Sequence, residues 1–571
     1  MLSVTNPEDI DWANMPVKEL LQGNALDSFV TYSLIDKIAV PNSAQQVSVL
    51  LSHCIPIFTD MEYNGLDVDV DLLKKTSERL TKDINDLKAT FDTFSFVQDF
   101  LKNNTDEIEE FNIKSSKVLN SFFGYFKKCY ALDILDASDI DKSAKTEKYS
   151  FNEVNLIKLK SFLDDGIKVL LKGKSTLNGW KNNGGHSTQI DSFTEVSQIV
   201  TNILKLRTYL KLSESYIQSS LDIIDKIGIN KLFCNYNLTG TVTGRLSCGA
   251  MVFNKQKYGV SMHTLPRSEE YNMRDVIVPN PEEVKDDYIF VAVDYSAMEL
   301  RVMAQACKDF ELVNAFKTGT DLHTVTAAKT FKVDNLEDVT KEQRQTGKMV
   351  NFLTLYGGGP KKLAEELNIS YMEAKKIIRD YHLAFPSIDE YKSRVIADLR
   401  KNNETTSLFG RVRHLEYPYK EITDKFDKFR VERQAMNSII QGTASDILLV
   451  TLVDLDRFFK ENKVNARLVA TVHDSIEFVI KTEDFFHHFQ EITSLFHNPD
   501  FRRAGLDTLY EYQVGGMLIP TSIDNWEIPL QIDFEVGKSF GSNIGLHFED
   551  IEGTYNITNP KEVVNYLSNL K

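Results

Sequence analysis

The stretch Tyr288-Ile289-Phe290-Val291-Ala292-Val293-Asp294 is an unbroken apolar run that closes on an acid. Its β-branched and aromatic residues are typical of a buried strand. An aspartate at the end of such a strand is costly to bury unless a cation meets it. The run therefore predicts a central strand and marks Asp294 as a candidate functional residue.

A second acid lies between two apolar runs, in Arg467-Leu468-Val469-Ala470-Thr471-Val472-His473-Asp474-Ser475-Ile476-Glu477-Phe478-Val479-Ile480. The pattern predicts a β-hairpin with His473 and Asp474 at its tip. Taken alone, each aspartate is more often a turn or capping residue than a metal ligand. Taken together, they match the preference of magnesium for a few carboxylates completed by phosphate oxygens and water. Two such acids can hold two ions, one activating an attacking oxygen and one stabilising a leaving oxygen.

A predicted helix covers residues 344–356 and places four side chains four residues apart: Arg344, Lys348, Phe352 and Tyr356. Four residues turn a helix by about 400°, so these side chains form one slowly drifting stripe. An ordinary amphipathic helix, with aromatics in the core and cations in water, fits the same spacing. The order favours a nucleotide, because two cations at one end suit phosphates and two aromatics at the other suit a base.

The rest of the chain divides near residue 230. The 571 residues are enough for several domains or subdomains. Residues 55–230 are Lys-rich and mostly helical in pattern, with an exposed loop expected over residues 178–188. Beyond residue 230, apolar strands alternate with amphipathic helices, which predicts an α+β core.

Composition excludes several classes of protein. Hydrophobic residues make up 42% and charged residues 26%, which is ordinary for a globular protein. No secretory signal, transit peptide or run of 18 to 20 apolar residues is present, so we expect a cytoplasmic protein without a membrane partner. The five scattered cysteines suggest no zinc or redox site. The net charge of -16 argues against a non-specific nucleic-acid coat protein but permits a local basic channel.

The sequence resembles family A (DNA polymerase I type) DNA polymerases. The fingers-helix pattern R-x-x-x-K-x-x-x-[FY]-x-x-x-Y-G is matched from Arg344 to Gly357, D-x-S-x-x-E-L-R from Asp294 to Arg301, and H-D at His473 and Asp474. Further matches are Thr241-Val242-Thr243-Gly244-Arg245-Leu246-Ser247, Asp321-Leu322-His323-Thr324, Leu408-Phe409-Gly410-Arg411, Glu432-Arg433-Gln434-Ala435-Met436-Asn437 and Gln441-Gly442-Thr443-Ala444-Ser445-Asp446. The resemblance extends from about residue 48 to residue 541.

The resemblance implies an α+β right-hand fold with an antiparallel palm sheet and helical fingers and thumb. The expected parts are residues 1–47 as an exonuclease remnant or linker, 48–230 as thumb, 231–320 as first palm segment, 321–424 as fingers and 425–571 as second palm segment.

The resemblance also implies the roles of individual residues in binding metal and nucleotide. Asp294 and Asp474 are expected to hold two Mg²⁺ ions, with help from the backbone carbonyl of Tyr295. The expected triphosphate ligands are Arg344, Lys348 and His323. Around the rest of the nucleotide, we expect Phe352 against the incoming nucleotide, Glu299 where a ribose 2′-hydroxyl would lie, and Tyr356 at the template base.

Primer-template DNA and deoxynucleotides are the expected partners. The residues expected to contact DNA are Arg245, Arg411, Asn437, Gln441 and His473. Two positions depart from the family pattern. Ser475 stands where a Glu commonly follows H-D, which we expect to remove a supporting acidic contact, and Ala297 replaces the usual Gln of D-x-S-Q.

The proofreading motifs of the family are almost absent. The family's Y-x-x-x-D element is matched only in part, by Gly23-Asn24-Ala25-Leu26-Asp27, in which Gly23 stands in place of the Tyr. We therefore expect no proofreading by this chain alone, and either a degenerate remnant or a split enzyme completed by a separate exonuclease subunit. A phage replisome, acting in the cytoplasm of a bacterial host, suits this composition, and a processivity factor could dock at residues 158–196 or 485–525.

Two other functions share some of these features. A single-subunit RNA polymerase has the same hand and paired acids, but Glu299 counts against it. A catalytically inactive accessory subunit would have little reason to keep Asp294, Arg344, Lys348 and Asp474 together.

Overall fold

The computed structural model describes residues 42–569 except 105–107, 109, 131–133, 135–137, 139–148, 172–175, 178–179, 182–185, 254, 269, 281–282, 284, 286, 368, 415–418, 500–511, 515–516, 520–525 and 552–553. Most of the predicted 1–47 remnant, including Asp27, lies outside the described residues. The same holds for much of the 178–188 loop and for parts of both segments predicted to dock a processivity factor.

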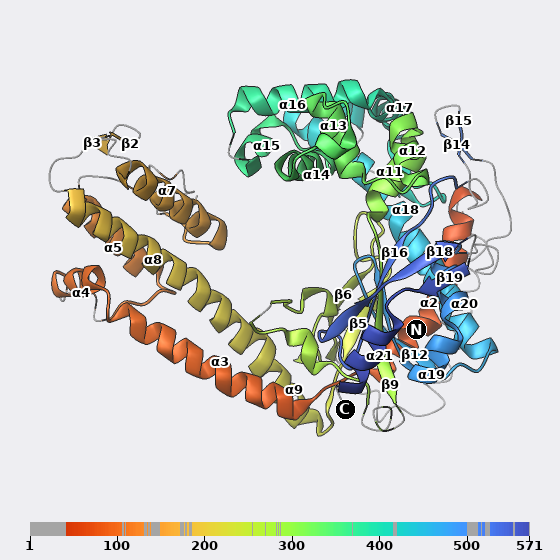
Figure 1. Cartoon of the computed structure of the whole chain (residues 1–571), viewed down its shortest axis with the longest axis horizontal. Coiled ribbons are helices and arrows are strands. Elements are labelled where there is room, and N and C mark those ends of the chain that lie inside the picture. The colour runs from red at the N-terminus through yellow and green to blue at the C-terminus, as the bar shows by residue number, and fades with distance from the viewer. Residues whose placement is uncertain are drawn as a thin grey trace, which may run out of the picture.

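A five-stranded antiparallel sheet lies at the centre of the molecule, in the order β12-β13-β9-β16-β17. The two runs singled out in the sequence form its first three strands, and Figure 1 labels β9, β12 and β16 of this sheet. The bounds are β9 Tyr288–Tyr295, β12 Ala466–Val472, β13 Ser475–Lys481, β16 Ile532–Gly537 and β17 Asn543–Leu546. The predicted strand and the predicted hairpin are confirmed, and they are hydrogen-bonded to each other.

One face of this sheet is packed against helices. The Tyr295 hydroxyl lies 2.7 Å from Thr451 Oγ1 and donates to the Phe496 carbonyl at 2.9 Å. The two partners belong to α18 (Lys425–Glu461) and α20 (Phe489–His497). Because side chains alternate along a strand, Asp294 points to the opposite face. Helix α18 is long and apolar enough to cross a membrane, but 94% of its most apolar window is buried inside the protein, as in a core helix.

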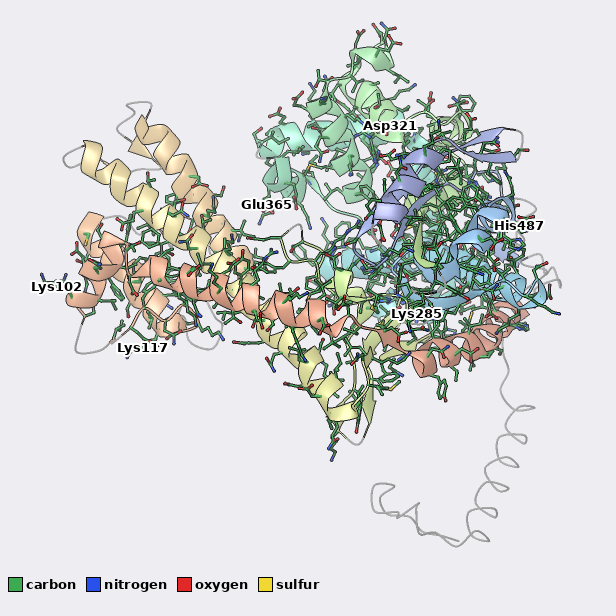
Figure 2. All side chains as sticks on the ribbon, turned by 60° about the horizontal axis from the view of Figure 1, so that its bottom comes forward. Lys102, Lys117, Lys285, Asp321, Glu365 and His487 are labelled. Carbon is green, nitrogen blue, oxygen red and sulfur yellow. The ribbon has the colours of Figure 1, made fainter. Side chains whose placement is uncertain are left out.

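A helical arm extends away from the sheet, to the left in Figure 1. It comprises α3 (Val70–Phe91), α4 (Ser95–Lys102), α5 (Ser116–Tyr130), α7 (Glu153–Leu171), α8 (His186–Lys211), the π-helix η2 (Leu212–Gln218) and α9 (Ser219–Ile227). Phe100, Phe122 and Phe126 are fully buried in its core. Figure 2 shows Lys102 and Lys117 on this arm. It also shows Asp321 and Glu365 on a second helical part, residues 298–402.

The arm is rooted at one short strand pair, β1 (Leu66–Asp67) with β4 (Lys231–Leu232). Asp67 is buried there and accepts hydrogen bonds from Lys231 at 3.2 Å and from Arg467 of β12 at 3.1 Å. The two ends of the arm therefore lie side by side, next to the strand that leads to Asp474.

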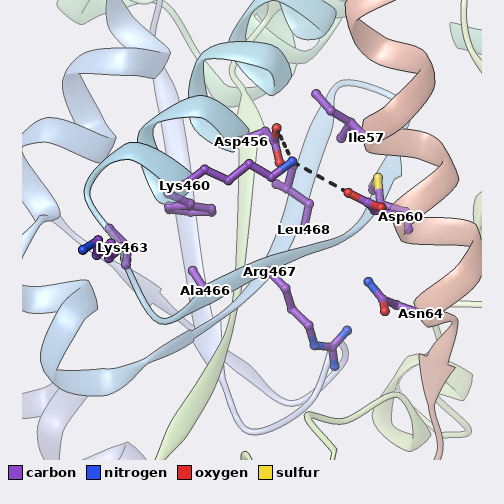
Figure 3. A pocket seen from close by; sticks show the side chains of 12 residues that line it. Ile57, Asp60, Asn64, Asp456, Lys460, Lys463, Ala466, Arg467 and Leu468 are labelled. Carbon is purple, nitrogen blue, oxygen red and sulfur yellow. Dashed lines mark hydrogen bonds and ion pairs between the residues drawn. The ribbon is translucent and has the colours of Figure 1, made fainter.

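Helix α2 (Asn42–Asn64) precedes the arm but packs on α18 and β12. A pocket of about 340 Å³ lies between them, and Figure 3 shows the Lys460 ammonium in it between Asp456, at 2.9 Å, and Asp60, at 3.7 Å. The predicted start of the thumb at residue 48 stays a prediction, and it falls within α2. Residues 42–64 lie with the sheet, and the arm begins after β1.

A second helical part lies above the sheet in Figure 1. Its helices are α11 (Met298–Cys307), α12 (Phe310–Lys317), α13 (Leu322–Phe331), α14 (Lys341–Leu355), α15 (Pro360–Leu367), α16 (Tyr371–Ala384) and α17 (Pro386–Asn402). Helix α14 is the predicted fingers helix. It begins with a capping box, in which Thr340 and Gln343 each accept from the backbone of the other.

The remaining elements are short. The strand pairs are β2 Thr176–Leu177 with β3 Trp180–Lys181, β5 Cys234–Asn237 with β6 Ser247–Ala250, β7 Val252–Phe253 with β8 Gln256–Lys257, β10 Glu404–Thr406 with β11 Val412–His414, β14 Tyr512–Val514 with β15 Met517–Ile519, and β18 Phe548–Ile551 with β19 Thr554–Ile557. The helical turns and short helices are η3 Met262–Thr264, η4 Met273–Val276, η5 Leu336–Asp338, η6 Tyr419–Glu421, α19 Thr482–His487 and α21 Pro560–Asn569.

Candidate active site

The two aspartates singled out in the sequence lie next to each other at one end of the sheet. Asp294 is the register partner of Ser475 in β13, directly after Asp474. The backbone N–H of Tyr295 donates to the carbonyl of Asp474 at 3.2 Å. The hairpin tip is therefore fixed beside the end of β9, as the sequence predicted.

The negative charge of the Asp294 and Asp474 carboxyl groups is only partly compensated by nearby cations. Loss of surrounding water raises the pKa of Asp294 to about 6, and the charges of Asp533, Glu535 and Glu299 add to this effect. Loss of water, Glu299 and Asp294 raise the pKa of Asp474 to about 7. A divalent cation relieves such crowding, so the chemistry of these donors fits magnesium.

The protein offers few metal-binding groups here. This suits a magnesium site whose remaining ligands are substrate oxygens and water. Within the described part of the chain, no cluster of three or more His, Cys, Asp or Glu side chains could hold a metal by itself. Magnesium is commonly bound by one or two carboxylates together with phosphates and water. Asp294 and Asp474 match that description.

Protons and magnesium are expected to compete for Asp294 and Asp474. Both folded-state pKa values are raised, so ionisation of these acids destabilises the metal-free protein as pH rises through about 6 to 7. Mg²⁺ binds the ionised forms, so its affinity should fall about tenfold between pH 8 and pH 6. The increase in melting temperature caused by Mg²⁺ should be larger at pH 8 than at pH 6. Equal increases at both pH values, or the same pH dependence in Asp474→Asn, would contradict this.

Cations of α14 lie at the predicted positions, but they differ in what they contact. Arg344 donates to both carboxylate oxygens of Asp321, at 2.8 and 3.0 Å. Lys348 is exposed, and the described residues give it no ion pair. Lys348 is thus available to a phosphate as it stands, whereas Arg344 would first exchange Asp321 for the phosphate.

His323 is oriented by a residue that the sequence analysis did not single out. Asn351 Nδ2 donates to His323 Nδ1 at 3.1 Å, and Thr326 Oγ1 donates to Asn351 Oδ1 at 3.0 Å. This arrangement leaves the proton on Nε2, where it can be donated outward. Burial lowers the pKa of His323, with Arg344 and Lys348 lowering it further, so the ring is neutral near pH 7. Its ring lies 5.9 Å from that of Phe352.

The close approach of α13 and α14 depends on Gly347. A Cβ atom at Gly347 would overlap the backbone oxygen of His323 and lie 3.1 Å from the backbone nitrogen of Ala327. Backbone atoms cannot rotate away, so the helices would have to separate. Position 347 falls inside the stripe motif, but spacing alone gives no sign of this contact.

Gly347→Ala is expected to lower stability by about 1 to 3 kcal/mol, as overpacking does. It should also raise the KM for the nucleotide, because His323 moves with α13. Thermal melting and single-nucleotide incorporation measure the two effects. Gly359→Ala is the control, because Gly359 has open space around it. Gly319→Ala is unsuitable, because Gly319 has a positive φ. A Gly347→Ala protein with unchanged stability and KM would contradict this.

A chain of contacts connects the end of α14 to the hairpin tip. The Tyr356 hydroxyl donates to Glu299 Oε1 at 3.1 Å, and Arg245 Nη2 donates to the same oxygen. Arg245 Nη2 also lies 3.5 Å from Asp474 Oδ1. Glu299 is buried, and burial with the nearby Glu299 charge raises the pKa of Tyr356 to about 12. Predicted nucleotide, DNA and metal residues are thus in contact with one another.

The residues predicted to contact DNA lie in different surroundings. Asn437 and Gln441 are half-buried one turn apart on α18, and His473 is exposed at the hairpin tip with a φ of 60°. Arg411 pairs with the fully buried Asp446, at 2.5 and 3.1 Å, and its side chain packs on Gly244. The structure thus shows Arg411 supporting the 241–247 loop, and a direct contact of Arg411 with DNA stays a prediction.

Sequence reasoning missed three acids on the face of the sheet that carries Asp294. Asp533 is the second register partner of Asp294, and Glu535 and Glu477 flank Ala292 on either side. The expected loss of an acidic contact at Ser475 stays a prediction, and Glu477, two residues further along the strand, places an acid on the same face. The alternation Ile532-Asp533-Phe534-Glu535-Val536 was a signal that could have found two of the three.

The antiparallel sheet with its paired acids, held between a helical arm and a cation-bearing helical part, defines a right-hand polymerase fold. A solved structure, the POL domain of Pol1 from M. smegmatis in complex with DNA primer-template and dNTP, is similar to it with a TM-score of 0.59 and 22% identity. The similarity covers 85% of this chain and 69% of the other. The chain belongs to DNA polymerase family A, whose model matches residues 136–542.

Curated relatives share part of this sequence. DNA polymerase I of Geobacillus stearothermophilus is 34% identical over 301 residues, which are 52% of this chain and 32% of that protein. DNA polymerase I of Helicobacter pylori is 31% identical over 343 residues, which are 58% of this chain and 35% of that protein. The chain thus matches about a third of the length of these relatives.

Proposed function

We propose that this protein is a DNA-templated DNA polymerase that extends a primer 3′ end with deoxynucleotides. The proposal is carried by the contact chain from Tyr356 through Glu299 and Arg245 to Asp474. It connects the helix that would bind the nucleotide to an acid that would bind metal. An accessory subunit without activity has no need of that connection.

Asp294 and Asp474 would hold the divalent cations, with the Tyr295 backbone carbonyl beside them. Two Mg²⁺ ions would activate the primer 3′ oxygen and stabilise the leaving oxygen. Arg245 lies beside Asp474 and offsets part of its charge. In the complex Arg245 would turn to the primer-template, together with Asn437, Gln441 and His473.

The fingers helix would bind and orient the nucleotide. Lys348 and the Nε2–H of His323 would donate to phosphate oxygens, and Arg344 would join them after leaving Asp321. Phe352 would pack on the nucleotide. The reaction would be an in-line attack of the primer oxygen on the α-phosphorus, with pyrophosphate leaving and Lys348 giving it a proton.

Glu299 would select deoxynucleotides by occupying the space that a ribose 2′-hydroxyl needs. Its carboxylate accepts a hydrogen bond from Tyr356, so it cannot swing aside without breaking that bond, even after Arg245 has turned to the primer-template. Such a fixed side chain rejects an extra hydroxyl more strongly than a mobile one. This favours a DNA polymerase over a single-subunit RNA polymerase. Phage replication, a separate exonuclease subunit and a processivity factor stay predictions from the sequence.

Primer extension tests the proposed function. The purified chain with primer-template, Mg²⁺ and four dNTPs should extend the primer according to the template, and EDTA should stop it. Glu299→Ala should reduce discrimination against ribonucleotides by about a hundredfold. No extension by the wild-type chain in Mg²⁺ would overturn the proposal, and equal use of both sugars by the wild type would favour an RNA polymerase.

A further inference from the structure

A buried acid that the proposed mechanism does not use lies behind the metal-binding end of the sheet. Glu477 is 1% exposed and lies on the same face as Asp294, one residue pair further along β13. Its Oε2 atom is buried without a hydrogen-bond partner. A buried acid with half its polar atoms unsatisfied is costly, so its presence needs a reason.

Glu477 is linked to the hairpin tip through Ser475. Ser475 Oγ lies 2.9 Å from the Val472 carbonyl and also forms a hydrogen bond with Glu477 Oε1. A hydroxyl group has a single proton. If Ser475 gives it to Val472, the carboxyl group of Glu477 must supply the proton of the other bond. Burial raises the pKa of Glu477 to about 8, which agrees with that arrangement.

The nearest cation does not replace this link. Arg274 lies close enough for its charge to act on Glu477, but the described contacts include no hydrogen bond between them. The Arg274 guanidinium instead lies 4.6 Å from the centre of the Phe540 ring, and its Nε is buried without a partner. Glu477 is therefore held at Ser475 and not by an ion pair.

The turn beside this link has a strained backbone. Val472 and Ser475 are the last register pair of the hairpin, and only His473 and Asp474 lie between them. His473 has a φ of 60°, in the left-handed region that residues other than glycine adopt at a cost. Strained conformations persist where their surroundings hold them. The hydrogen bonds from Glu477 to Ser475 and from Ser475 to Val472 close the base of this turn.

We propose that Glu477, acting through Ser475, is a positioning residue that holds the 472–475 turn and thereby the Asp474 carboxylate where a divalent cation binds. The proposal rests on the proposed function only for its effect on catalysis. The effect on metal binding can be measured on the protein without DNA.

Glu477→Met and Glu477→Gln separate positioning from bulk stability. Met removes the hydrogen bond and fills the space with apolar atoms, so the melting temperature should stay the same or rise. The Kd for Mg²⁺ measured by calorimetry without DNA should rise about tenfold, and the incorporation rate should fall by a similar factor with KM for dNTP unchanged. Gln keeps the shape and can donate to Ser475, so it should stay within about threefold of wild type.

Two further variants complete the test. Thr493→Val removes another buried, unpartnered polar atom, in α20 on the other side of the sheet, and should leave Mg²⁺ affinity unchanged. Ser475→Ala breaks the same link from the other end and should resemble Glu477→Met, which covers the case in which Met prevents folding.

Wild-type Mg²⁺ affinity in both Glu477→Met and Ser475→Ala would overturn the proposal. So would a Gln variant as impaired as Met, because the charge of Glu477 would then be what matters. Failure of the wild type to extend primers, with these Mg²⁺ effects intact, would count against the proposed function alone.

Discussion

Asp294→Asn and Asp474→Asn are each expected to slow nucleotide incorporation by about three to four orders of magnitude, or ~4 to 5.5 kcal/mol of barrier. Asparagine keeps the shape of the side chain but loses the charge that would hold the cation. Single-turnover primer extension with saturating DNA and dNTP measures the rate. DNA affinity should be kept or increased, because one negative charge near the phosphates is gone.

The stability of these variants gives an independent check. Both aspartates have raised pKa values, so their ionised forms repel their surroundings near pH 8. Each Asn variant should therefore melt at a higher temperature than the metal-free wild type at pH 8. Asp287→Asn, at the other end of β9, is the matched control and should change neither rate nor the effect of Mg²⁺. Activity within tenfold of wild type in either active-site variant would contradict the metal assignment.

Lys348→Ala is expected to lower the incorporation rate by about two to three orders of magnitude. Lys348 is exposed and has no ion pair with the described residues, whereas Arg344, the other cation of the stripe, is bound to Asp321 and cannot take its place at once. A positioned proton donor is worth about 10²- to 10⁴-fold. Rapid-quench incorporation measures the rate, and pyrophosphorolysis measures the reverse reaction.

Arginine at position 348 distinguishes charge from proton transfer. Lys348→Arg keeps the positive charge but does not readily give up a proton, so it should restore nucleotide binding and leave most of the rate defect. Lys341→Ala, in the exposed first turn of the same helix, is the control. An unchanged rate in Lys348→Ala would remove Lys348 from the mechanism.

The strands around the Asp294 face of the sheet were predictable because their side chains follow simple rules. The run ending in Asp294 and the hairpin at Asp474 have the residue pattern of buried strands, and the structure shows them paired. The capped helix from Lys341 to Leu355 agrees with the spacing of its stripe. In each case the information lies within a short window of sequence.

Pairings between distant segments were not predictable from the residues alone. Register between β9, β13 and β16 decides that Glu477 and Asp533 share a face with Asp294, and no local pattern sets that register. The packing of α2 on α18 and the close approach of Gly347 to His323 are likewise contacts between distant segments. Arg411 shows the limit most clearly, because a motif match could not reveal that Asp446 is its partner.

The strand pair β1 with β4 makes the arm a side branch of the chain. Its two ends meet at Asp67, so a longer, shorter or unrelated branch could be joined there without shifting any strand of the sheet. Because Arg467 contacts the same aspartate, a tilt of the branch would be felt first in the strand that leads to the hairpin tip. A different arm joined at this strand pair would keep the pairing of the sheet, and its tilt would reach Asp474 only through the contact between Asp67 and Arg467.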